Sequence, residues 1–133
     1  VDADCDRDAL RFTVRQRGAG FCHTGDRPCW GDDGGLGALE RRLARRLANP
    51  PPGSYTHRLA TDPDLLAAKL AEEAGELAAA AGRDETVWEA ADVLYFTCVT
   101  LAARGVPLTD VAAELDRRAR ATRRRDGTRT NRN

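Results

Sequence analysis

Two pairs of acidic residues stand at helical spacing in the second half of the chain. Glu73 and Glu76 form an E-x-x-E pair, and after twelve intervening residues Glu89 and Asp92 form an E-x-x-D pair. Residues three apart share one face of a helix, so each pair would present both carboxylates in the same direction. Moving bare carboxylates out of water costs several kcal/mol even after relaxation, unless protons or cations neutralise them.

The residues around these acids favour a buried site over the alternative, a solvated acidic face. Glu73 lies beside an apolar stripe, and the segment around Asp92 is apolar nearly all round. Lys69 is the only lysine in the chain, and neither segment contains a histidine. A hard divalent cation such as Mg²⁺ prefers oxygen ligands and commonly bridges carboxylates to a phosphate-bearing substrate. We therefore expect Mg²⁺ to be bound by Glu73, Glu76, Glu89 and Asp92.

Four helices are predicted from apolar periodicity and from capping signals. The polar stretch GSYTHRLATDPD, residues 53–64, is expected to be a connector. Gly82 is expected to end the second helix, and Asp84 to cap the third. The tail from Arg117, with eight arginines, is expected to be frayed or disordered. The helices should run from 35 to before Pro50, from a cap at Thr61 or Asp62 to about 81, from 84 to about 104, and from 107 to about 116.

Residues 1–34 form a separate unit with three of the four cysteines and almost no helical signal. Leu10, Phe12 and Val14 alternate with polar residues, which predicts a strand with one covered face. A segment this small needs a metal, a partner chain or further sequence to be ordered. Metal ligation or reduced thiols are favoured over disulfides, and Cys98 is expected to be a core thiol.

The composition indicates a globular protein whose net charge does not attract it to nucleic acid or to a membrane. The 133 residues contain 21 Lys plus Arg and 21 Asp plus Glu, so the formal charges balance. We find no apolar run of membrane-spanning length and no secretory leader, so a cytoplasmic location is expected. The length predicts one domain with space for a small appended module.

Several motifs occur in an order that resembles a known family. KLAEEAGE and EAADVLYF are preceded by PPGSYTHRL and followed by LAARGVPLTDVAAEL. From about Leu36 to Arg118, the chain is similar to the phosphoribosyl-ATP pyrophosphohydrolases, members of the MazG-like all-α nucleotide pyrophosphohydrolases. Many relatives have a histidine where this chain has Phe96, so any role of that histidine is absent here.

The resemblance implies a mainly α, four-helix MazG-like bundle over residues 35–119. Its third helix is too apolar to leave uncovered, so we expect it to pack in a homodimer. It implies Mg²⁺-dependent hydrolysis of phosphoribosyl-ATP to phosphoribosyl-AMP and pyrophosphate in histidine biosynthesis. The four acids would hold the metal, with Glu72 as an added ligand or water-orienting base. Ser54, Tyr55, Thr56, Arg58 and Lys69 are candidates for positioning the phosphates, although each could instead have a purely structural role.

The N-terminal stretches DCDRDALRFTVRQ and FCHTGDRPCWGD resemble the end of phosphoribosyl-AMP cyclohydrolase, which takes the next step and is fused ahead of the pyrophosphohydrolase in some proteins. Three thiolates with an open fourth position are typical of catalytic zinc. The resemblance implies zinc on Cys5, Cys22 and Cys29, and a second Mg²⁺ on Asp4, Asp6 and Asp8, shared between two subunits. Because the upstream half of that domain is missing from residues 1–34, no cyclohydrolase activity is expected from this chain alone.

Two other functions are open. One is a MazG-like housecleaning enzyme that acts on ordinary nucleoside triphosphates. The other is a zinc-stabilised module that binds nucleic acid through its arginine-rich tail, although no interleaved aromatic residues or recognition motif support it. Residues 120–133 are otherwise expected to be a basic tail, or a linker toward a further fused histidine-biosynthesis domain.

Overall fold

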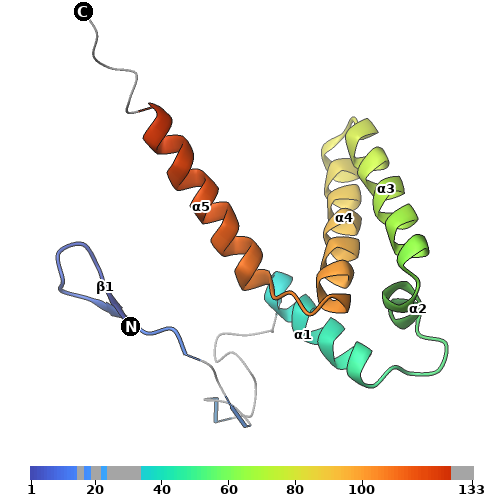
Figure 1. Ribbon diagram of the computed structural model, residues 1–133, viewed down its shortest axis with the longest axis horizontal. Coiled ribbons are helices and arrows are strands. Elements are labelled where there is room, and N and C mark those ends of the chain that lie inside the picture. The colour runs from blue at the N-terminus through green and yellow to red at the C-terminus, as the bar shows by residue number, and fades with distance from the viewer. Residues whose placement is uncertain (15–16, 19–21, 24–33, 127–133) are drawn as a thin grey trace, which may run out of the picture. The chain divides into compact units, whose positions relative to one another are not determined.

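The computed structural model in Figure 1 describes residues 1–14, 17–18, 22–23 and 34–126. The chain separates into two compact units, Val1–Asp33 and Gly34–Asn133. The first unit contains a short hairpin and the second contains the helices, so the fold is mainly helical, as predicted. The helices are α1 (Gly35–Ala48), α2 (Tyr55–Thr61), α3 (Pro63–Ala79), α4 (Arg83–Ala103) and α5 (Leu108–Asp126).

The prediction of a connector over residues 53–64 is wrong because this stretch contains helix α2. Ser54 caps the helix, since its hydroxyl accepts a hydrogen bond from the backbone N–H of His57 at 3.3 Å. Leu59 is 0% exposed and Thr56 is 3% exposed, so two side chains of this short helix lie in the interior. Tertiary burial therefore stabilises a helix that is too short to be stable by itself.

A single residue joins α2 to α3. Asp62 is the C-cap of α2 and also the N-cap of α3, where its carboxylate accepts the backbone N–H of Leu65 at 3.0 Å. Pro63 occupies the first turn of α3, where a missing N–H costs nothing. The predicted start of this helix is thereby confirmed.

The turn between α3 and α4 differs from the prediction. Gly82 is the N-cap of α4 with extended backbone, and Asp84 lies in the first helical turn instead of at the cap. The carboxylate of Glu85 accepts the backbone N–H of Ala81 at 2.9 Å, which closes the turn. Figure 1 shows α3 and α4 side by side after this turn. The two acid pairs therefore lie on adjoining antiparallel helices.

Helix α4 ends as the sequence predicts. Gly105 adopts φ +66°, a left-handed conformation that glycine takes at little cost. The backbone N–H of Val106 bonds to the carbonyl of Leu101 at 2.9 Å, and that of Gly105 bonds to the carbonyl of Ala102 at 3.2 Å. These two bonds satisfy carbonyls at the helix end, as in a Schellman motif.

The core of the helical unit is small. It consists of Leu43 from α1, Leu59 and Leu66 from α2 and α3, and Phe96, Cys98 and Val99 from α4. Cys98 is buried, as expected of a core thiol. Burial raises the pKa of this thiol, with a smaller contribution from the charge of Glu40.

Helix α5 meets the other helices at its first residue. The backbone N–H of Leu108 donates to Glu40 Oε1 at 2.7 Å, and its side chain packs against the core. Further along, Leu115 is exposed. The prediction of a frayed tail from Arg117 is wrong as far as Asp126, where α5 ends. Residues 127–133 lie outside the described part of the chain.

The N-terminal unit contains one hairpin, in which β1 (Asp2–Ala3) pairs antiparallel with β2 (Leu10–Arg11). Asp2 faces Arg11 across the pair, and their side chains form an ion pair at 3.0 Å. Phe12 and Val14 are exposed, so among the described residues nothing covers the face that alternation predicts to be buried. No single described helix passes a length-and-apolarity test for a membrane span, although α4 and α5 pass it together as a pair bent by 112°.

Candidate functional site

Three carboxylates gather where α3 and α4 adjoin. Glu73 and Glu76 come from α3 and Glu89 comes from α4, and each contributes an oxygen that lies within 4.8 Å of the others. The i, i+3 spacing places the two acids of α3 on one face, and the antiparallel packing brings Glu89 opposite them. This group, called here the acid cluster, combines three of the four carboxylates predicted to bind Mg²⁺.

The three side chains of the acid cluster differ in their exposure to solvent. Glu73 is only 7% exposed, Glu89 is half-buried and Glu76 is exposed. Glu89 Oε2 is buried and has no hydrogen-bond partner in the described structure. A buried carboxylate oxygen without a partner carries a desolvation penalty that a bound cation would remove. An all-oxygen donor set with solvent access on one side fits Mg²⁺.

The electrostatics of the acid cluster also favour a bound cation. Burial raises the pKa of Glu89, and the neighbouring charges of Glu76, Glu73 and Asp92 raise it further. Like charges held close together disfavour ionisation of each other, so added positive charge would stabilise the cluster. A divalent cation would favour the ionised form of these carboxylates.

Lys69 supplies the one cation that contacts the cluster within the described chain. Its Nζ atom lies 2.6 Å from Glu72 Oε2 and 3.2 Å from Glu73 Oε1. Hydrogen bonds to these two carboxylates raise the pKa of Lys69. Nζ also lies 5.9 Å from the ring centroid of Phe96. Lys69 therefore stays charged and orients Glu72 and Glu73.

Two predicted residues lie outside the group of three. Glu72 is exposed and points its carboxylate to Lys69. Asp92 is half-buried, and its charge contributes to the raised pKa of Glu89, so it lies close enough to act on the cluster. Their roles as an added ligand or base and as a fourth metal ligand remain predictions.

The positioning candidates lie on or next to α2. Ser54 caps this helix, and Thr56 Oγ1 lies 3.0 Å from Tyr95 Oη of α4. The guanidinium of Arg58 lies 5.1 Å from the ring centroid of Tyr55, a stacked cation–π contact. Each of these four residues thus has a structural contact of its own. A cleft of about 390 Å³ is lined by Ser54, Tyr55 and Arg58.

A second cleft, of about 480 Å³, was not predicted from the sequence. It opens between α1, the start of α2 and α4, and is called here the arginine cleft. Pro51 lines both clefts. The sequence signal that could have indicated the arginine cleft is the run of arginines in α1, which contains a single glutamate. The polar residues lining it are Arg42, Arg45, Arg46, Asn49, Thr56 and Tyr95.

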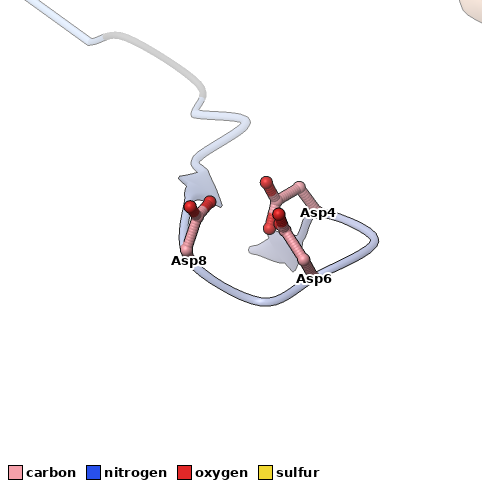
Figure 2. A group of neighbouring side chains, drawn as sticks. All are labelled: Asp4, Asp6 and Asp8. Carbon is pink, nitrogen blue, oxygen red and sulfur yellow. The ribbon is translucent and has the colours of Figure 1, made fainter.

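In the N-terminal unit, the structure brings three predicted ligands together. Asp4, Asp6 and Asp8 lie on the loop of the hairpin (Figure 2), and each offers an oxygen within 4.8 Å of the others. All three are exposed. Asp4 Oδ1 accepts the backbone N–H of Ala9 at 3.2 Å, and the bond to this backbone group is the main cause that lowers the pKa of Asp4. A second Mg²⁺ at this loop remains a prediction.

Only two of the three predicted zinc ligands belong to the residues that the structure describes. Cys5 is exposed and Cys22 is half-buried, whereas Cys29 lies outside the described residues. A zinc site of three thiolates therefore remains a prediction.

Comparison with known proteins decides the family. A sequence model described as phosphoribosyl-ATP pyrophosphohydrolase matches residues 36–119, the span that contains the acid cluster and the arginine cleft. The chain belongs to this family. Residues 1–31 match a second model, described as phosphoribosyl-AMP cyclohydrolase. This pyrophosphohydrolase family member therefore carries cyclohydrolase-like sequence ahead of its helical unit.

Curated relatives carry both segments within longer chains. The histidine biosynthesis bifunctional protein his7 of Schizosaccharomyces pombe is 46% identical over 127 residues, which cover 96% of this chain and 30% of his7. The histidine biosynthesis trifunctional protein of Saccharomyces cerevisiae is 45% identical over 96% of this chain and 16% of its own length. The bifunctional protein HisIE of Deinococcus radiodurans is 42% identical over 89% of this chain and 61% of its own. The chain thus spans less than two thirds of each of these relatives.

Proposed function

We propose that this chain hydrolyses phosphoribosyl-ATP to phosphoribosyl-AMP and pyrophosphate, with Mg²⁺ held by Glu73, Glu76, Glu89 and Asp92. The observation that carries the proposal is the acid cluster, with its unpartnered Glu89 oxygen, inside the span that matches the family. The names of the relatives support a role in histidine biosynthesis.

The chain's own residues do most of the positioning. Bound Mg²⁺ would neutralise phosphate charge and lower the pKa of a coordinated water. Lys69 lies between Glu72 and Glu73 and fixes both carboxylates, so Glu72 is held at the exposed edge, where it could orient an attacking water. Positive charge beside Glu89 would favour its ionised form, which is the form that binds a metal. These groups prepare a site for a triphosphate without contributing a covalent step.

The direct test is pyrophosphate release from phosphoribosyl-ATP with and without Mg²⁺. Glu73→Gln, Glu89→Gln and Asp92→Asn should each reduce kcat/KM by at least about 100-fold, since each removes a charged ligand. Asp84→Asn is the matched control, because Asp84 is an exposed acid in the first turn of the same helix. Activity that is independent of Mg²⁺, or unchanged in Glu73→Gln, would refute the proposal.

The substrate separates this function from that of a housecleaning enzyme. The relatives are named for histidine biosynthesis, which favours phosphoribosyl-ATP over ordinary nucleoside triphosphates. We expect kcat/KM for phosphoribosyl-ATP to exceed that for ATP or dCTP by a large factor. Equal values for these substrates would favour the housecleaning activity instead.

A homodimer is part of the proposal. Helix α4 exposes Val87, Trp88 and Leu94, and Trp88 is 71% exposed. Large apolar side chains gathered on one helix are typical of a surface that another chain covers. Analytical ultracentrifugation at micromolar concentration should give the mass of a dimer. Leu94→Glu should shift the mass toward that of a monomer, and a monomeric parent protein would contradict the prediction.

For residues 1–34 we propose metal binding without cyclohydrolase turnover. Zinc would be held by Cys5, Cys22 and Cys29, and a second Mg²⁺ by the loop of Asp4, Asp6 and Asp8. No described residue before Gly34 is buried, so nothing in that part encloses a reaction site. Zinc analysis should find bound metal that is lost in Cys22→Ser, whereas conversion of phosphoribosyl-AMP by the chain alone would refute the absence of turnover. A cytoplasmic location stays a prediction.

A further inference from the structure

The arginine cleft has the composition of an anion site. Its lining includes the guanidinium groups of Arg42, Arg45 and Arg46, and it contains no acidic residue. The single glutamate of α1, Glu40, is committed elsewhere, because it accepts the backbone N–H of Leu108 at 2.7 Å. The volume of about 480 Å³ lies within the range of small-molecule sites. A ribose phosphate would fit such a space.

The three arginines have no polar partner among the residues that the structure describes. Within the described chain, none of their guanidinium groups forms an ion pair or a hydrogen bond. Arg42 lies three residues before Arg45 and four before Arg46, so like charges adjoin on one face of α1 and destabilise the isolated helix. An anion between them would remove this repulsion. Guanidinium groups bind phosphate in bidentate fashion, which suits this role.

A hydroxyl donor completes the lining. Thr56 and Tyr95 share one hydrogen bond at 3.0 Å, in which either oxygen can donate. Whichever hydroxyl accepts this bond keeps its own O–H for another acceptor. Both residues line the cleft, so that remaining O–H is available to a ligand oxygen. The site thus combines fixed positive charge with a neutral donor.

A purely structural explanation covers part of the observation. Arg45 and Arg46 lie in the last turn of α1, where positive charge stabilises the helix dipole. This explanation does not extend to Arg42, which lies one turn earlier. It also does not account for the cleft, in which all three converge with the hydroxyl pair.

Helix α4 contributes to both the cleft and the acid cluster, through Tyr95 and Glu89. Tyr95 lies three residues beyond Asp92, so the two share neighbouring positions on the helix surface. The acid cluster offers carboxylates for a metal that holds a triphosphate, whereas the cleft offers cations and no metal ligands. Phosphoribosyl-ATP carries a second anion, a phosphate monoester on the ribose attached to its base, that is separate from the triphosphate. ATP lacks this group.

We propose that the arginine cleft binds the phosphate monoester of the phosphoribosyl arm, through Arg42, Arg45, Arg46 and the hydroxyl pair. The assignment to this arm rests on the proposed function, whereas the affinity of the cleft for a sugar phosphate does not. The cleft therefore determines specificity: it recognises what distinguishes phosphoribosyl-ATP from ATP. Binding energy from this remote group would be used to orient the triphosphate at the acid cluster.

The test uses Arg42→Gln/Arg46→Gln, with Arg41→Gln as the matched control. Arg41 lies on the same helix but lines a different cleft, so it loses one charge of α1 without touching the proposed site. The double variant should raise KM for phosphoribosyl-ATP by at least about 10-fold, because charge-assisted hydrogen bonds are lost. Inhibition by ribose 5-phosphate should weaken by a similar factor, and inhibition by ATP should change by less than about 2-fold. Arg46→Lys, which keeps the charge but loses the bidentate geometry, should fall between.

Other results would overturn the proposal. Equal losses for phosphoribosyl-ATP and ATP would place the triphosphate in the cleft, and unchanged kinetics would leave the cleft without a substrate role. A binding measurement without turnover separates this proposal from the proposed function. In an NMR titration with ribose 5-phosphate, the side-chain Nε–H signals of Arg42 and Arg46 should shift in the parent protein. If they do not shift, the cleft binds no sugar phosphate, whatever the hydrolysis assay shows; thermal melts show that each variant is folded.

Discussion

Glu73 and Glu89 belong to different helices, yet oxygens of their carboxylates lie within 4.8 Å of each other. Glu73 is nearly buried and has Lys69 at 3.2 Å, whereas Glu89 has a buried oxygen without any described partner. The two acids therefore adjoin where α3 packs against α4, and among the described residues only Glu73 has a counter-ion. This arrangement lowers the stability of the metal-free fold and leaves a site at which a cation can bind.

The first prediction concerns this cost. Glu89→Gln should raise the melting temperature of the metal-free protein by a few degrees, because it removes one of the repelling charges. It should also abolish the stabilisation that Mg²⁺ gives the parent protein, since a ligand is lost. Differential scanning calorimetry with EDTA and with Mg²⁺ measures both effects.

Asp84→Asn is again the control, and it should leave both melting temperatures unchanged. Asp84 is an exposed acid at the start of α4 that pairs only with its neighbour Arg83 in the described structure. A lower melting temperature for metal-free Glu89→Gln would mean that Glu89 has a stabilising contact. The metal site would then need another explanation.

The second prediction concerns the bond between Thr56 and Tyr95. Thr56 is 3% exposed, so loss of its partner leaves a buried hydroxyl unsatisfied. Tyr95→Phe should lower the free energy of unfolding by about 1–2 kcal/mol. A double-mutant cycle with Thr56→Val, followed by urea unfolding, should give a coupling energy of about 1 kcal/mol. Additive effects of the two substitutions would show that the bond does not form in solution.

The third prediction tests helix α2. Leu59 is 0% exposed and belongs to the core cluster, so Leu59→Ala would leave a cavity between α2 and its neighbours. The free energy of unfolding should fall by about 2–5 kcal/mol. Leu36→Ala in α1 is the control, because Leu36 is exposed and its truncation should cost less than about 1 kcal/mol. Similar losses for both would mean that α2 does not pack as described.

Helix α2 also shows where sequence reasoning stops. The long helices were predictable because their apolar residues recur over many turns, as in α4, and because Asp62, Pro63 and Gly105 give clear end signals. Helix α2 has seven residues and a polar composition, so no periodicity marks it. Its stability comes from the burial of Leu59 and Thr56 by elements distant in sequence. Local patterns contain no information on that contact.

The candidate site divides in the same way. Spacing within each helix predicts that Glu73 and Glu76 share a face, but the register between α3 and α4 decides which acid of α4 meets them. The structure selects Glu89 and leaves Asp92 outside the group of three. The arginine cleft depends on how α1 packs against α4, so the run of arginines in α1 could suggest positive charge but not a cleft. The contact between the hydroxyl groups of Tyr95 and Thr56 likewise depends on how α2 packs against α4.

The last prediction concerns Glu114 in α5. Its carboxylate accepts hydrogen bonds from Arg117 Nε at 2.6 Å and Arg118 Nε at 2.7 Å. The bonds from Arg117, followed by those from Arg118, lower the pKa of Glu114 from 4.5 to about 2. A carboxyl group whose pKa is lowered in the folded state stabilises that state at pH values above its pKa in the unfolded state. The stabilisation is lost as the pH falls from about 4.5 through about 2.

At pH 6 the parent protein should therefore be more helical than Glu114→Gln by circular dichroism, and the difference should vanish near pH 2. Molar salt should reduce the difference at pH 6 as well, because the group is partly exposed and its pairs are screened. Asp116→Asn is the matched control, since Asp116 forms no ion pair in the described part of α5. Carbon-13 NMR of the Glu114 carboxyl should give a midpoint near pH 2. A midpoint near 4.5 would show that both arginines point elsewhere in solution and are available to another partner.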